Sequence, residues 1–93
     1  MISAVIHIFG LPKELGTVHK VEVQLKDKAG MAEVVAALRE KVPGLENIVI
    51  RADEDRLKKF YRFNINGRIF FDGMDFELHE GDKIALLMPP AGG

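Results

Sequence analysis

The stretch FYRFNINGRIFF, residues 60–71, decides the fold of this chain. Two runs rich in aromatic and β-branched residues flank Asn66-Gly67, the preferred centre of a two-residue turn between antiparallel strands. The stretch therefore predicts a β-hairpin. Because side chains alternate across a strand, Phe70 and Phe71 cannot both face the core, and at least one ring is expected to be exposed.

The N-terminal half predicts two further strands and a helix. Residues 2–9 and 18–25 alternate as extended chain, and the Gly- and Pro-containing segment between them favours a first hairpin. Apolar residues then recur at helical spacing from Met31 to Val42, which predicts about three turns. Pro43-Gly44 is expected to end this helix, and Leu45 is expected to fold back onto its apolar face.

The remaining segments complete the predicted topology. Residues 47–50 are a candidate strand, and the charged residues 51–59 are expected to form a surface loop. Residues 83–88 are so uniformly apolar that they predict a central strand covered on both faces. The order strand, strand, helix and then several short strands predicts an α+β fold, a β-grasp, in which a mixed sheet of about five strands packs on one main helix.

The composition of the chain argues against several classes of function. The chain has 93 residues, 47% of them apolar and 29% charged, as expected of one globular domain. A net charge of −1 argues against a nucleic-acid partner. The chain has no cysteine, which excludes thiolate ligands and a cysteine nucleophile, and its three histidines lie far apart, so no metal site is expected.

The expected location is the cytoplasm. No stretch approaches the roughly 20 apolar residues of a membrane span, and no basic region precedes the apolar start of the chain. We therefore expect no membrane partner.

Residues 1–88 are predicted to form the β-grasp domain and residues 89–93 an extended C-terminal tail. Pro89-Pro90 restricts the chain to extended geometry, so the tail is held away from the body. Gly92 and Gly93 have no Cβ and can thread a narrow channel, which leaves the Gly93 carboxylate sterically open. From Met88 onward the tail reaches at most about 16–18 Å. This is enough to enter a pocket on another protein.

These features together resemble the ubiquitin-like sulfur carriers of the MoaD/ThiS family. The resemblance is carried by the β-grasp order, the Asn66-Gly67 turn, the phrase LHEGDKIAL at residues 78–86 and the ending Pro89-Pro90-Ala91-Gly92-Gly93. Pro43-Gly44-Leu45 after the helix also fits the family. Within this family, the pattern resembles that of MoaD, the small subunit of molybdopterin synthase.

The resemblance implies a function centred on Gly93. An E1-like, MoeB-like enzyme would use ATP to adenylate the Gly93 carboxylate, and sulfur would then replace one oxygen to give a thiocarboxylate. A MoaE-like large subunit would use that sulfur to build molybdopterin. Gly92 would provide access, while Met88, Pro89, Pro90 and Ala91 would dock the tail. The chain itself would bind no cofactor and would be non-catalytic alone.

Two alternatives stay open. Related carriers serve thiamine synthesis or tRNA thiolation, and related modifiers form isopeptide bonds through the equivalent of Gly93. A stand-alone hydrolase is the weakest hypothesis, because no Ser/His/Asp pattern or phosphate-binding glycine loop is present.

The aromatic and basic side chains of the predicted sheet also have expected roles. Core packing accounts for most of the aromatic residues, and Phe70 and Phe76 are predicted to contribute to a partner surface on the sheet near the tail. Arg62 and Arg68, which flank the hairpin turn, are expected to be solvated strand residues, with contact to an acidic partner as the alternative. His7 is expected to be a packed strand residue.

Overall fold

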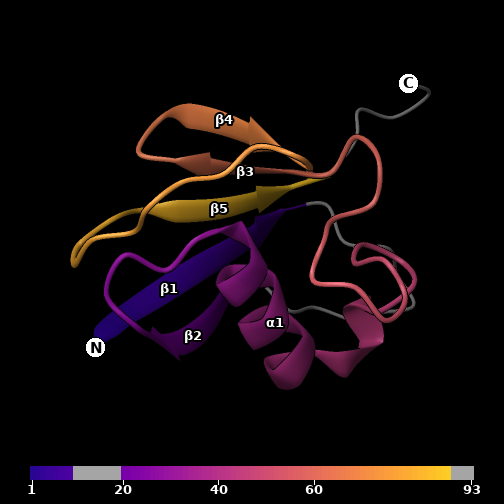
Figure 1. Ribbon diagram of the computed structural model, residues 1–93, viewed down its shortest axis with the longest axis horizontal. Coiled ribbons are helices and arrows are strands. Elements are labelled where there is room, and N and C mark those ends of the chain that lie inside the picture. Colours follow the sequence, from indigo (N-terminus) through magenta and orange to yellow (C-terminus); the bar gives the residue numbers. More distant parts are fainter. Residues whose placement is uncertain (10–19, 89–93) are drawn as a thin grey trace.

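The computed structural model describes residues 1–9 and 20–88, which form a five-stranded sheet packed against one α-helix (Figure 1). The elements are β1 (Ile2–Phe9), β2 (Lys20–Leu25), α1 (Met31–Lys41), the 3-10 helix η2 (Pro43–Leu45), β3 (Arg62–Ile65), β4 (Arg68–Phe71) and β5 (Ile84–Leu87). The strand order is β2-β1-β5-β3-β4; β1 runs antiparallel to β2 and parallel to β5, and β3 is antiparallel to both β4 and β5. The predicted β-grasp fold is therefore confirmed.

The first two strands follow the predicted alternation. Every second residue of β1 is buried, beginning with Ile2, and Val21, Val23 and Leu25 of β2 are buried in the same way. The predicted start of the second strand at Val18 lies outside the described residues.

The predicted hairpin around Asn66-Gly67 is confirmed. Asn66 and Gly67 have φ angles of 53° and 90°, the left-handed region that asparagine and glycine tolerate best. Asn64 Oδ1 also accepts a hydrogen bond from the Gly67 N–H at 2.8 Å. Phe71 is 44% exposed and Phe70 is half-buried, so the expected exposure of one ring is observed.

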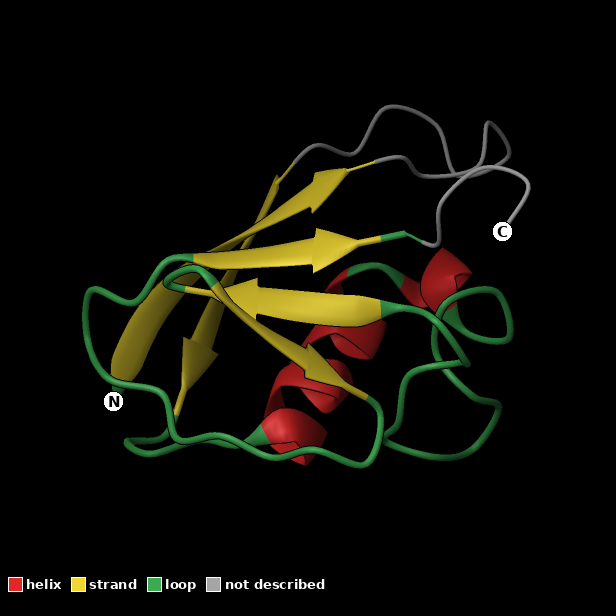
Figure 2. Ribbon diagram, turned by 90° about the horizontal axis from the view of Figure 1, so that it is seen from above, coloured by secondary structure: helices red, strands yellow, loops and turns green. Residues whose placement is uncertain are grey.

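Helix α1 covers one face of the sheet (Figure 2). Val34, Val35 and Leu38 are fully buried, and Leu45 of η2 folds back into the same core as expected. The helix ends at Lys41, and the Val42 N–H still donates to the Leu38 carbonyl. No helix within residues 1–9 and 20–88 is long and apolar enough to cross a membrane.

Strand β5 is central as predicted, but the expectation that it is covered on both faces is wrong. Ile84 and Leu86 are buried in the core on the α1 side of the sheet, whereas Ala85 and Leu87 are only half-buried. The reason is that α1 covers a single face. Apolar residues of β5 therefore contribute to the opposite face of the sheet.

The candidate strand at residues 47–50 is also wrong. Asn47 has a φ of 67°, and the N–H groups of Ile48, Val49 and Ile50 all donate to the Leu45 carbonyl. The segment is thus a tight turn that carries only isolated bridges at Ile50. Its apolar residues are explained by burial, because Val49 and Ile50 are fully inside the core.

Residues 51–59 form a loop as expected, but the loop is anchored to the body. Leu57 is fully buried, and the Lys58 N–H donates to the Val49 carbonyl at 2.8 Å. Arg39 of α1 donates to the Arg51 carbonyl and pairs with Asp55. Charged residues therefore hold the loop in place and do not only face the solvent.

Candidate functional site

The C-terminal tail begins at the middle of the sheet. Leu87 is the last residue of β5 and is paired with Phe9 of β1 and with Arg62 of β3. Met88 follows and packs half-buried against the core. Residues 89–93, including the predicted reacting Gly93 and docking residues Pro89, Pro90, Ala91 and Gly92, lie outside the described residues. The structure therefore describes the base of the tail.

Arg62 contacts this base directly. Its Nη1 donates to the Met88 carbonyl at 3.2 Å and to the Phe60 carbonyl at 3.3 Å. Its guanidinium carbon also lies 6.0 Å from the centre of the Phe71 ring, within the range of a cation–π contact. The expectation that Arg62 is merely a solvated strand residue is therefore wrong. No local sequence signal indicates this contact, because Arg62 and Met88 are brought together only by strand pairing.

The sheet face opposite α1, which we call the open face, is rich in exposed apolar side chains. Register and burial place on it the large exposed residues Val5, Phe9, Ile69 and Phe71, together with the half-buried Ala85 and Leu87. Exposed apolar side chains gathered on one surface are typical of an interaction site. The alternation of residues 2–9 already indicated that Val5 and Phe9 share a face.

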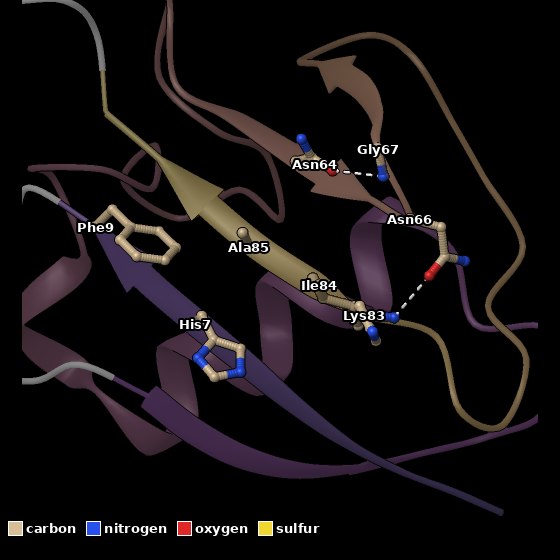
Figure 3. A pocket seen from close by; sticks show the side chains of 8 residues that line it. All are labelled: His7, Phe9, Asn64, Asn66, Gly67, Lys83, Ile84 and Ala85. Atoms are coloured by element: carbon tan, nitrogen blue, oxygen red, sulfur yellow. Dashed lines mark hydrogen bonds between the residues drawn. The ribbon is translucent and has the colours of Figure 1, made fainter.

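A shallow hollow of about 370 Å³ lies in the open face (Figure 3). Its floor includes Ala85, whose small side chain lies in register between His7 of β1 and Asn64 of β3. Phe9 forms one wall. His7 is exposed on this face rather than packed. The hollow is open and largely apolar, so it suits the side chain of a partner better than a buried small molecule.

Phe70 and Phe76, predicted to bind a partner, are held mainly by the core. Their ring centres are 5.2 Å apart in an edge-to-face contact, and Phe76 also meets the buried Phe63 at 6.2 Å. Phe70 pairs with Phe63 across the hairpin and so shares the helix-side face. The structure therefore does not bring these two rings to the open face. Their role in partner binding stays a prediction.

Among the described residues, metal-ligating side chains are not clustered and Asp72 is held in ion pairs. No cluster of three or more metal-ligating side chains occurs within residues 1–9 and 20–88. Asp72 is bound by Arg56 at 2.8 Å and by Arg51 at 3.2 Å. Burial opposes ionisation of Asp72, but the hydrogen bonds and charges of the two arginines prevail and lower its pKa. Asp72 is thus a structural ion-pair partner.

Comparison with known proteins agrees with this geometry. The five-stranded mixed sheet packed on one helix, with a Gly-Gly ending after its central strand, is the arrangement of a ubiquitin-like β-grasp protein. The sequence pattern of the ThiS family matches residues 6–93, and the chain belongs to that family. It is therefore a ubiquitin-like sulfur carrier or modifier of the ThiS/MoaD type, whose members work with partner enzymes. Among curated proteins, none matches the chain.

Solved structures show the same fold. The crystal structure of SAMP1 from Haloferax volcanii has a TM-score of 0.78 at 26% identity, covering 98% of this chain and 99% of that one. A crystal structure of H. volcanii small archaeal modifier protein 1 has the same TM-score at 24% identity, covering 96% and 99%. A putative molybdopterin converting factor subunit 1 from Pyrococcus furiosus has a TM-score of 0.68 at 18% identity, covering 96% and 99%.

Proposed function

We propose that this protein is a sulfur carrier that is activated at the Gly93 carboxylate and donates sulfur for molybdopterin synthesis. A carboxylate oxygen of Gly93 attacks the α-phosphorus of ATP, forming an acyl-adenylate and releasing pyrophosphate. Hydrosulfide then attacks the carboxyl carbon and displaces AMP, which leaves a thiocarboxylate and a proton. ATP is bound by the E1-like partner, and the large synthase subunit receives the sulfur.

One observation carries this proposal. In a member of the ThiS family, the central strand β5 is followed by Met88, a proline pair, Ala91 and then Gly92-Gly93. A carboxylate is a poor electrophile until one oxygen becomes a leaving group, so an adenylating partner is required. The similarity to a molybdopterin converting factor subunit supports the molybdopterin pathway.

The open face is the proposed docking surface for the activating enzyme. Its exposed rings, Phe9 and Phe71, come from strands on either side of β5. A partner that covers this face is held beside the base of the tail, since Leu87 contributes to the face and Met88 follows it. Docking on the open face and insertion of the tail can thus occur together.

The test is the intact mass after incubation with ATP, sulfide and a molybdopterin-pathway activating enzyme that is active on its own carrier. We expect a shift equal to the replacement of one oxygen by sulfur. A form with one alanine added after Gly93 is the control, because its terminal carboxylate is displaced by one residue and is attached to an α-carbon that bears a methyl group. Sulfur incorporation into the extended form would contradict the proposed mechanism.

A second candidate function is protein modification through Gly93, which the similarity to small archaeal modifier protein 1 favours. The last lysine or arginine is Lys83, so tryptic digestion of a conjugate leaves residues 84–93 attached to the acceptor lysine. Peptides carrying this branch in cell extract would support conjugation. A thiocarboxylate without such peptides would support the carrier function alone.

A further inference from the structure

We propose that Arg62 is a positioning residue that orients the C-terminal tail for reaction in the activating enzyme. The inference rests on the proposed function, because it concerns how Gly93 is presented. It follows from the contacts of the Arg62 guanidinium group, which meets both Phe71 of the open face and the Met88 carbonyl at the base of the tail.

Strand pairing ends at the base of the tail. Arg62 is the first residue of β3 and is in register with Leu87, the last residue of β5. Before Arg62 the chain turns away, since Phe60 has a φ of 74° and the Tyr61 N–H donates to the Lys58 carbonyl. Strand β3 therefore does not continue alongside Met88.

The Arg62 side chain takes the place of the missing strand partner. The Met88 carbonyl accepts a hydrogen bond from Arg62 Nη1 at 3.2 Å. This carbonyl belongs to the peptide bond between Met88 and Pro89, and a peptide bond is planar. Holding the oxygen therefore fixes the plane from which the tail leaves the sheet. Because proline restricts both its own φ and the conformation of the residue before it, the sequence predicts that this orientation carries over to the residues that follow.

The guanidinium group is itself held by two neighbours. The same Nη1 donates to the Phe60 carbonyl, and the Phe71 ring centre lies 6.0 Å from the guanidinium carbon. A planar guanidinium can stack on a ring while donating several hydrogen bonds, whereas a lysine ammonium is a flexible point charge. The site is thus matched to arginine rather than to positive charge alone.

The test compares Arg62→Ala, Arg62→Lys and Lys59→Ala as substrates of the E1-like enzyme that adenylates the wild-type chain. Lys59 is the matched control, because its ammonium lies over the Phe60 ring at 5.1 Å and the described contacts do not link it to Met88. Thermal unfolding first confirms that each variant is folded. Pyrophosphate release then gives KM and the maximal rate, and the ¹³C signal of the Met88 carbonyl reports on the hydrogen bond in the free protein.

For Arg62→Ala we expect a maximal rate about tenfold lower with KM within about twofold, because the tail still binds but reaches the reactive geometry less often. Arg62→Lys should restore only part of the rate, and Lys59→Ala should match the wild type. The Met88 carbonyl signal should shift in both Arg62 variants and not in Lys59→Ala.

Three results would overturn the inference. A raised KM with an unchanged maximal rate would mean that Arg62 binds the partner directly. Full recovery in Arg62→Lys would mean that charge alone matters. An unmoved Met88 signal would mean that Arg62 does not hold the tail base. If the wild-type chain is not adenylated at all, the proposed function fails, while the Met88 signal still decides whether Arg62 holds the tail base.

Discussion

Asp75 caps a helix that begins 44 residues earlier in the chain: its Oδ1 accepts a hydrogen bond from the Met31 N–H at 2.9 Å. Gly30 occupies the N-cap position of α1 and has no side chain that could do this. A Cβ at Gly30 would lie 2.6 Å from Asp75 Oδ1 and 3.2 Å from the Phe76 carbonyl oxygen. The cap therefore comes from another segment, and glycine leaves room for it.

This arrangement predicts that a normally favourable substitution is harmful. Serine is among the best N-cap residues, yet Gly30→Ser should lower the free energy of unfolding by about 1–3 kcal/mol, because its Cβ crowds Asp75. In an Asp75→Ala background the same serine should lower the free energy of unfolding less, or should raise it, since its side chain replaces the lost cap. Urea unfolding of the two single variants and the double variant measures this coupling, and additive effects would contradict it.

Two aspartates that accept backbone hydrogen bonds, Asp75 and Asp82, predict that the fold is sensitive to acid. The Met31 and Phe76 N–H groups lower the pKa of Asp75, and the His79 N–H lowers that of Asp82. A carboxyl with a lowered pKa in the folded state stabilises fully above the unfolded value of about 3.9, and this contribution is lost as the pH falls through the folded pKa. The free energy of unfolding should therefore decrease below about pH 4, where the unfolded chain binds protons first.

Asp75→Asn tests this pH dependence. Its amide oxygen still accepts the hydrogen bonds but does not titrate. Between pH 7 and pH 3, denaturant unfolding should thus show a smaller decrease in the free energy of unfolding for this variant than for the wild type. An identical decrease would exclude Asp75 as a contributor to the acid sensitivity.

Leu57 is predicted to anchor the charged loop. Leu57→Ala should lower the free energy of unfolding by about 2–5 kcal/mol, because a fully buried leucine is removed. Lys59→Ala, an exposed change two residues away, should stay within about 0.5 kcal/mol. Urea unfolding distinguishes the two cases. Equal small effects would mean that the loop contributes little to the core.

Asn66 is expected to stabilise the hairpin in two ways. Its amide donates to Asp82 Oδ1 at 2.8 Å and accepts from the Lys83 N–H at 2.9 Å, and its φ is positive. Asn66→Gly keeps the backbone conformation but loses both bonds, at a cost of about 1–2 kcal/mol. Asn66→Ala should cost about 1 kcal/mol more, because alanine tolerates positive φ poorly. In thermal unfolding, the melting temperature should fall from the wild type to Asn66→Gly and again to Asn66→Ala.

The open face is expected to bind the activating enzyme through its hollow. Ala85→Arg fills the hollow and should raise KM for adenylation by about tenfold or more while the domain stays folded. Ala32→Arg makes the same change at an exposed position of α1 and serves as the matched control. Steady-state kinetics measures both. An unchanged KM in Ala85→Arg would place the docking surface elsewhere.

The sequence predicted those parts of the fold that depend on neighbouring residues. Alternation specified the faces of β1 and β2, helical spacing specified α1, and Asn66-Gly67 specified the hairpin. Residues 47–50 were predicted wrongly because their apolar side chains serve core packing in a turn, and a short apolar run has no period that distinguishes this from a strand.

Tertiary structure alone decided which distant residues meet. The sequence indicated the Gly-Gly ending and the apolar residues of the last strand. Three other features depend on how the elements pack: the covering of β5 on one face only, the cap that Asp75 provides to Met31, and the contact of Arg62 with Met88. The physical reason is the distance along the chain over which each effect acts. Backbone preferences and side-chain periodicity act over a few residues, whereas these contacts join segments that only the assembled sheet and helix bring together.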